Sequence, residues 1–184
     1  MNNKSHKKMG FTLLEMIVAM GVFIIAVLFS VGSLLSLTNA QKKALVLQST
    51  QDNLRFALET IARDIRTGDF YYCGSSISDV PPIPSRKDCS FGGPSLTFQN
   101  VSGNTITYQM KDSRIQKKDG VLNFEPITSL DITVEYLTFY VIGSPDTDNL
   151  HPRVTIVAKG VSGSGSRRSD LNLQTTVSQR TIQR

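Results

Sequence analysis

Charge is missing from one long stretch of this sequence. Residues 16–41 contain no Asp, Glu, Lys or Arg, and an apolar run that starts at Phe11 continues almost unbroken to Leu37. A run of about 18 or more apolar residues is long enough for a membrane-spanning helix. An ordinary secretory signal fits poorly, because its apolar core has only about 7–15 residues, fewer than the apolar run found here.

Proline and histidine are also scarce. No proline precedes Pro81, so nothing in the first 80 residues breaks a helix in the way that proline does. The two histidines are His6 and His151. The Gly-Ser segment 160–165 has neither the G-x-S-x-G spacing of a nucleophile elbow nor the Gly-Lys-Ser/Thr ending of a P-loop. We therefore predict that the chain is not an enzyme.

Positive charge is concentrated at the amino terminus. The chain holds 20 Lys and Arg against 15 Asp and Glu, a formal net charge of +5. Residues 1–10 contribute +3 through Lys4, Lys7 and Lys8, residues 11–68 contribute +1, and residues 69–184 contribute +1. The chain beyond residue 10 is thus close to neutral, whereas a strongly DNA-binding surface needs a dense basic patch.

Within the apolar run stands a single charge, the carboxylate of Glu15. An acidic residue at the centre of a bilayer costs roughly 2.5–3.5 kcal/mol on insertion scales. A plain membrane anchor has no use for such a group, so Glu15 calls for a functional explanation.

The segment Gly10-Phe11-Thr12-Leu13-Leu14-Glu15, preceded by a short basic leader, resembles the class III prepilin leader of type IV pilins and pseudopilins. The resemblance implies that a prepilin peptidase of the inner membrane cuts between Gly10 and Phe11 and then methylates the new amine of Phe11. It also implies that Glu15 neutralises the amino-terminal ammonium of a neighbouring subunit in a filament. Positive residues beside a spanning helix stay cytoplasmic. We therefore expect a single-pass inner-membrane protein with its head outside the cytoplasm, in the periplasm or the extracellular space, before it enters a pilus or pseudopilus.

A helical pattern continues beyond the membrane run. Apolar residues recur with the spacing of one helix face. They are Leu47, Leu54, Leu58, Ile61 and Ile65. The pattern predicts one helix over residues 12–67, with a Glu59–Arg63 ion pair and Gly68 as its stop. Residues 51–66 also resemble the stem of PilW-like and J-type minor pilins and pseudopilins, which continue into a cysteine-containing loop.

Cys73 and Cys89, the only cysteines, bracket a segment rich in proline and serine without periodicity. In an exported domain a disulfide is the natural interpretation, and closing a loop of about 15 residues would contribute roughly 3 kcal/mol. Two free thiols or half of a metal site are the alternatives. A metal site is disfavoured because no histidine lies near either cysteine.

From Ser95 onward apolar and polar residues alternate, which predicts β-strands. We expect a hairpin around residues 101–104, a short return at 113–116 and a strand at 121–124. Further strands are expected at 129–142, with a bulge near Tyr136, and at 153–158 and 171–177. The predicted fold class is α+β: a long amino-terminal helix, half transmembrane and half amphipathic, packed on an antiparallel sheet as in pilins.

Two further groups are weak candidates for binding. The cluster Asp146, Asp148 and Asn149 offers oxygen ligands for calcium, the one cofactor considered, but it does not complete the EF-hand pattern. Arg167 and Arg168 form a small basic spot that could contact DNA. A polar turn and a solvated loop are the simpler interpretations of these two groups.

The predicted organisation is a leader at 1–10, a transmembrane assembly helix at 11–40, a stem helix at 41–68, a Cys-bracketed loop at 69–94 and a head at 95–184. The predicted function is that of a structural minor pilin or pseudopilin subunit. Its partners would be the prepilin peptidase, other pilin or pseudopilin subunits and an inner-membrane assembly platform, in a type IV pilus or a type II secretion pseudopilus. The alternative is a membrane-tethered or pilus-borne binding module for DNA uptake or adhesion.

Overall fold

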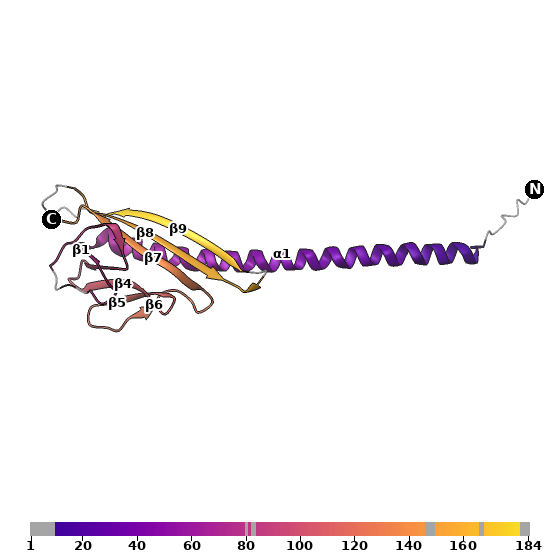
Figure 1. The fold of residues 1–184 in the computed structure, drawn as a ribbon, viewed down its shortest axis with the longest axis horizontal. Coiled ribbons are helices and arrows are strands. Elements are labelled where there is room, and N and C mark those ends of the chain that lie inside the picture. Colours follow the sequence, from indigo (N-terminus) through magenta and orange to yellow (C-terminus); the bar gives the residue numbers. More distant parts are fainter. Residues whose placement is uncertain (1–9, 80, 82–83, 146–149, 166–167, 181–184) are drawn as a thin grey trace, which may run out of the picture. The chain divides into compact units, whose positions relative to one another are not determined.

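The computed structural model describes residues 10–79, 81, 84–145, 150–165 and 168–180. The chain forms two compact units, Met1–Lys42 and Lys43–Arg184. Helix α1, Leu13–Thr67, contributes to both and confirms the helix expected over residues 12–67 (Figure 1). The second unit, here called the head unit, also contains all the strands.

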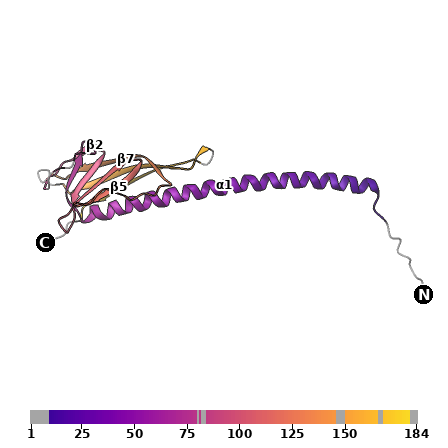
Figure 2. The ribbon, with the colours of Figure 1, turned by 90° about the horizontal axis from the view of Figure 1, so that it is seen from below.

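Within the head unit, one face of α1 is buried against the strands. The apolar stripe predicted from the sequence supplies most of this face, although Leu47 is still 41% exposed. The buried residues of α1 are Thr50, Leu54, Ala57, Leu58, Ile61, Ala62 and Ile65. Figure 2 shows the strands on one side of this part of the helix. Burial of α1 therefore begins at Thr50, where the all-round apolar pattern has already given way to a single stripe.

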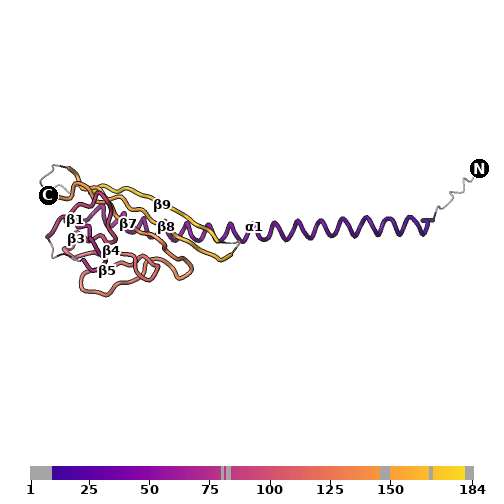
Figure 3. The backbone as a smooth tube through the Cα atoms, in the orientation of Figure 1, coloured from indigo at the N-terminus to yellow at the C-terminus, as the bar shows by residue number. Residues whose placement is uncertain are grey.

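The strands form two antiparallel sheets (Figure 3). The five-stranded sheet has the order β1-β3-β4-β5-β6, with β1 Asp69–Gly74, β3 Ser95–Gln99, β4 Thr105–Lys111, β5 Arg114–Asp119 and β6 Glu125–Pro126. The four-stranded sheet has the order β2-β7-β8-β9, with β2 Cys89–Gly93, β7 Thr133–Ile142, β8 Arg153–Ser162 and β9 Ser169–Ser178. The α+β prediction is confirmed, with two sheets in place of the one expected.

Two expectations about strands were wrong. Residues 69–94 were expected to be a loop, but their ends form β1 and β2, which belong to different sheets. Residues 121–124 were expected to be a strand, but the chain turns there after Gly120, whose φ is +59°. The pairing with β5 is made instead by β6, through Gln116 opposite Pro126.

The bulge predicted near Tyr136 is confirmed. Val134 pairs with Gly160 and Tyr136 with Lys159, so one residue of β7 is left without a partner at this step. The extra residue reverses which positions face the core, as bulges do. Tyr136 itself is 44% exposed, and the buried side chains lie on either side of the shift. They are Ile132 and Val134 before it, and Leu137, Phe139 and Val141 after it.

The end of α1 packs closely against the five-stranded sheet. The helix ends at Thr67, as expected, and Gly68 donates its N–H to the carbonyl of Ile65. Gly68 does not take a left-handed conformation, whereas Phe70, in β1, has φ +57°. A Cβ on Gly68 would lie 2.5 Å from Phe98 Cδ2, so glycine is needed here for packing.

A partly buried polar contact joins α1 to the same sheet. Asp64 Oδ2 accepts hydrogen bonds from Tyr108 Oη at 2.6 Å and from Lys117 Nζ at 2.7 Å. Burial and the neighbouring Asp64 carboxylate both raise the pKa of Tyr108. The Glu59–Arg63 pair expected from spacing was wrong, because Glu59 instead pairs with Arg55 at 2.9 Å.

Replacing Asp64 by asparagine is expected to lower the free energy of unfolding by about 1.5–3 kcal/mol, because hydrogen bonds to a charged group of this kind are lost. The measurement is denaturant unfolding of the full chain in detergent micelles, followed by circular dichroism. Asp52→Asn, on the exposed face of the same helix, is the matched control and should stay within about 0.5 kcal/mol of wild type. Equal effects of the two substitutions would contradict the role given to Asp64.

Candidate functional site

The amino-terminal end of α1 carries the residues that the sequence singled out. The N–H of Glu15 donates to Thr12 Oγ1 at 3.3 Å, and the N–H of Met16 donates to the Thr12 carbonyl at 3.2 Å. Thr12 is therefore the N-cap of the helix, in the T-x-x-E arrangement of a capping box. Sequence reasoning missed this cap, although the three-residue spacing of Thr12 and Glu15 was the signal for it.

Gly10 and Phe11 precede the helix and are not held by the fold. Gly10 is exposed, and a Cβ added to it would have no heavy atom within 4 Å. Phe11 is 79% exposed. Packing within the described residues therefore gives no reason for glycine at position 10, and the bond between the two residues is accessible to another molecule.

Glu15 lies in the first turn of α1 with its side chain exposed. Among the described residues it forms no ion pair. A carboxylate in this position interacts favourably with the positive end of the helix, an effect of about 0.3–1 kcal/mol at exposed sites. The Glu15 carboxylate can therefore pair with a cation from outside the described residues.

The apolar side chains around Glu15 are uncovered. Every residue from Gly10 to Leu37 is exposed in the structure. Among the described helices, α1 is the one that is long and apolar enough to cross a membrane. Lipid or other protein chains can cover this surface, whereas the described part of the chain does not.

The two cysteines lie in two edge strands, Cys73 in β1 and Cys89 in β2. Cys73 and Cys89 form a disulfide with a Cα–Cα distance of 5.8 Å, which confirms the predicted pairing. Beside it, both oxygens of the Asp88 carboxylate accept hydrogen bonds, one from the N–H of Gly143 and one from that of Ser144, each at 2.9 Å. The disulfide and Asp88 together tie β2 to β1 and to the end of β7.

The loop that follows β1 is held by a second carboxylate. Asp79 accepts a hydrogen bond from the N–H of Ser75 at 2.9 Å and one from Tyr72 Oη at 3.2 Å. These bonds, the one from Ser75 first, lower the pKa of Asp79, and the nearby Lys87 acts in the same direction. This carboxylate therefore stabilises the local fold of the loop.

The calcium candidates Asp146, Asp148 and Asn149 lie outside the described residues. In the described part of the chain, no group of three or more His, Cys, Asp or Glu side chains is placed to hold a metal ion. His151 is exposed and lines an open cleft of about 520 Å³ at the end of the head unit where α1 ends. The cleft is lined by Thr67, Gly68, Asp69, Phe70, Gln99, Asn100, Val101, Gly103, His151, Gln179 and Arg180.

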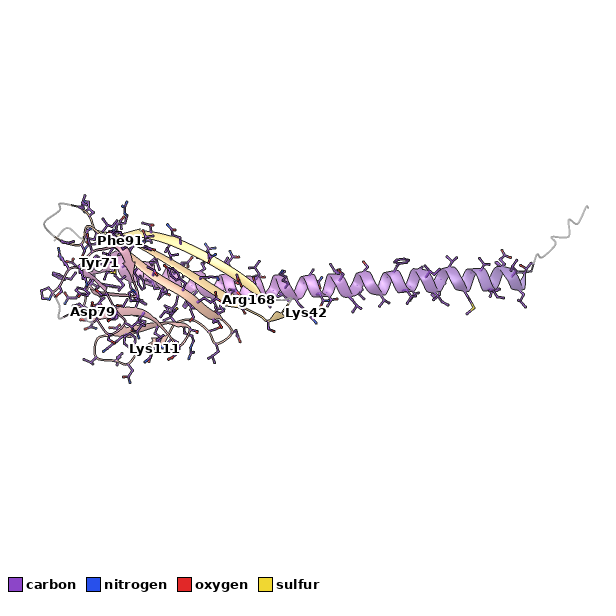
Figure 4. All side chains as sticks on the ribbon, viewed as in Figure 1. Lys42, Tyr71, Asp79, Phe91, Lys111 and Arg168 are labelled. Carbon is purple, nitrogen blue, oxygen red and sulfur yellow. A yellow bond between two sulfur atoms is a disulfide. The ribbon has the colours of Figure 1, made fainter. Side chains whose placement is uncertain are left out.

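Arg168, half of the predicted basic spot, is engaged by two carboxylates. Its guanidinium donates to Glu135 Oε1 at 2.8 Å and to Asp170 Oδ1 at 3.0 Å. Glu135 also pairs with Lys159 Nζ at 2.6 Å, and these partners, Lys159 first, lower the pKa of the Glu135 carboxyl. Arg167 lies outside the described residues. Figure 4 shows Arg168 at the opposite end of the head unit from Tyr71 and Phe91.

Comparison with known proteins adds no family to these features. No protein-family model, curated protein or solved structure matches the chain. The resemblance of the amino terminus to prepilins therefore stays a prediction from the sequence.

The Glu135 network predicts a defined pH dependence. A lowered pKa means that the folded state favours the carboxylate, so the contribution of Glu135 is present above the ordinary glutamate pKa of about 4.3 and is lost as the pH falls through the folded value. Glu135→Gln should therefore lower the melting temperature at pH 7, and the difference from wild type should be smaller at pH 3, below the ordinary glutamate pKa. Thermal unfolding of the full chain in detergent micelles at both pH values measures this.

Glu125→Gln is the control for that comparison, because Glu125 is exposed and forms no ion pair among the described residues. Its melting temperature should match wild type at both pH values. A Glu135→Gln difference that is the same at pH 7 and pH 3 would contradict the electrostatic origin.

Proposed function

We propose that the chain is a minor pilin-like or pseudopilin-like subunit, cut after Gly10, methylated on Phe11 and assembled into a type IV pilus or a type II secretion pseudopilus. The observation that carries the proposal is the exposed carboxylate of Glu15 in the first turn of a helix whose apolar side chains are uncovered. Such a carboxylate needs a cationic partner once it is surrounded by apolar material. In a filament that partner would be the ammonium of Phe11 on a neighbouring subunit.

The magnitudes favour an assembly role for Glu15 over a purely local one. Its interaction with the helix end is worth about 0.3–1 kcal/mol. An acidic residue at the centre of a bilayer costs roughly 2.5–3.5 kcal/mol. At the bilayer centre, capping alone would therefore not offset the cost of Glu15, and a cation from a neighbouring chain would reduce that cost.

The surroundings of Gly10 support processing at this position. Nothing in the described chain packs where its side chain would be, so the requirement for glycine would come from a peptidase that reads this residue. Phe11 follows it in an exposed, non-helical segment. A peptidase must draw the backbone into its site in an extended form, and these two residues can adopt that form without unfolding α1.

The proposal places α1 in the inner membrane before assembly and the head unit outside the cytoplasm. The three lysines of residues 1–10 favour the cytoplasmic side, and a disulfide suits an oxidising compartment. The inner-membrane assembly platform and other pilin-type subunits would then be its partners.

A membrane-tethered or pilus-borne binding module is the competing proposal. Its DNA-uptake version is less favoured, because Arg168 already meets two carboxylates in the head unit. Cell fractionation separates the two proposals: a structural subunit is found in filaments released by shear, and a tethered module stays with the membrane.

Gly10→Leu is expected to block processing, because the residue before the cut would no longer fit the peptidase. Mass spectrometry of the chain purified from its own cells should find residues 1–10 retained and Phe11 unmethylated. Gly21→Leu is the matched control: Gly21 also has no heavy atom within 4 Å of an added Cβ, and this variant should be cut normally. Cleavage of Gly10→Leu at the wild-type rate would contradict the proposed cut site.

Glu15→Val should still be cut and methylated but should assemble poorly, with at least about a tenfold loss of shear-released filaments, because the neighbouring ammonium would be left unpaired in an apolar environment. Quantitative immunoblots of shear and membrane fractions measure it. Glu59→Val, an exposed change on the same helix, is the control for lost charge. Wild-type filament yield from Glu15→Val would remove Glu15 as the assembly contact.

A further inference from the structure

The two sheets of the head unit end in four edge strands, β1 and β6 in one and β2 and β9 in the other. An edge strand presents a row of unpaired backbone N–H and C=O groups, which can pair with another chain. Natural proteins blunt such edges with short strands, bulges, proline, charged side chains or a covering segment. The four edges can therefore be compared for these protections within one molecule.

Three of the edges are protected. Strand β2 has five residues and a register shift against β7, and β6 has two residues, one of them Pro126. Along β1, the backbone of Lys87 covers the free side: its N–H donates to the carbonyl of Tyr71, and its carbonyl accepts from the N–H of Cys73, both at 3.0 Å. Each of these edges offers little continuous backbone to another strand.

Strand β9 has almost none of these protections. It has ten residues, and it pairs with β8 without a register shift from Ser178 opposite Arg153 to Ser169 opposite Ser162. It contains no proline, lysine or arginine, and Asp170 is its one charged residue. Among the strands of the described residues, β8 is its only partner. The other side of β9 is thus a long, regular and nearly uncharged edge.

A groove of about 330 Å³ runs beside this edge, between β9 and the part of α1 in the head unit. That volume lies within the range of roughly 300–1,000 Å³ that ligand sites occupy. Leu58 and Ala62 of α1 and Leu173 of β9 line the groove with apolar surface, and Thr175 lines it from β9. A strand added to β9 would place every second side chain in or over this groove, because successive side chains point to opposite faces.

The rim of the groove is positive. Arg55 and Glu59 form an ion pair with each other, which leaves the guanidinium of Arg66 as the unbalanced charge. Arg66 is exposed and has no ion-pair partner among the described residues. An acidic side chain on the added strand would therefore complement this rim.

We propose that the free edge of β9 and the adjoining groove form a docking site for an extended segment of another protein chain. The segment would join the four-stranded sheet as a fifth strand, bonded to β9 through its backbone. Its apolar side chains at alternate positions would enter the groove beside Leu58, Ala62 and Leu173, and a carboxylate would meet Arg66. This mode of strand addition takes affinity from the main chain and specificity from alternate side-chain pockets. It requires neither filament assembly nor Glu15.

The test uses the full chain in detergent micelles and a panel of fluorescent ten-residue peptides in which valine and threonine alternate and one glutamate is moved along the peptide. Fluorescence anisotropy should detect binding of at least one register. Thr175→Lys, which puts a charge into the groove, should weaken that peptide at least about tenfold, or 1.4 kcal/mol. Asn172→Lys adds the same charge on the exposed face of β9 and should change affinity less than about twofold.

Backbone pairing is tested separately from side-chain fit. Two versions of the bound peptide carry N-methyl groups on alternate amides, one version on the odd positions and one on the even positions. An edge strand bonds one set of amides only, so one version should lose binding and the other should keep it. Equal binding of both versions would overturn the proposed strand addition.

Arg66→Glu covers the case in which Thr175→Lys does not fold, because Arg66 is exposed. It should weaken the glutamate peptide and strengthen the same peptide with lysine in place of glutamate. Absence of binding by every peptide of the panel, or unchanged binding by Thr175→Lys in a folded protein, would overturn the proposal. Concentration-dependent dimers of the wild type that Thr175→Lys abolishes would mean that a second copy occupies the edge, which would also overturn it.

Discussion

The uncovered apolar surface of α1 is the constraint on which the rest of this protein depends. Large side chains from Phe11 to Leu37 are each at least 41% exposed in the described chain. Apolar surface of this kind costs about 25 cal/mol per Å² in water, so it has to be covered by something outside the described chain. Under the proposed function, lipid before assembly and neighbouring helices afterwards would both cover it. Glu15 suits the second environment better than the first, because a neighbouring chain can bring a cation and hydrocarbon cannot.

In the head unit, by contrast, α1 has one buried face and one exposed face. The two sheets bury the face of α1 that starts at Thr50. Polar groups then fix the position of the helix end against these sheets. Tyr71 Oη donates to the carbonyls of Ile65 and Gly68 at the last turn, at 2.5 and 2.7 Å, and Asp64 joins the same turn to β4 and β5. The Cys73–Cys89 disulfide joins β1 to β2. The helix end is therefore the best-anchored part of α1, which suits an element whose other end has to serve a different environment.

Several charged groups of the head unit find their partners within the unit. Asp79, Glu135 and Arg168 find partners within the unit, so they offer little free charge to a ligand. Strand β9 is different: its free edge is regular, almost uncharged and bordered by a groove with one unbalanced arginine. Unused backbone hydrogen-bonding capacity next to apolar surface is the combination that strand addition requires.

The sequence by itself determined α1, the exposed carboxylate at Glu15 and the pairing of Cys73 with Cys89. Each depends on neighbours in the chain, through helical periodicity and the lack of proline, or on the fact that there are only two cysteines. The bulge near Tyr136 was also readable, because a phase shift in alternation is a local signal. Only the tertiary structure decided that the head has two sheets, that both ends of the cysteine segment are strands and that Asp64 meets Lys117, 53 residues away. These features arise from pairing between distant segments, and local patterns cannot show which of several possible strand partners a segment will bury itself against.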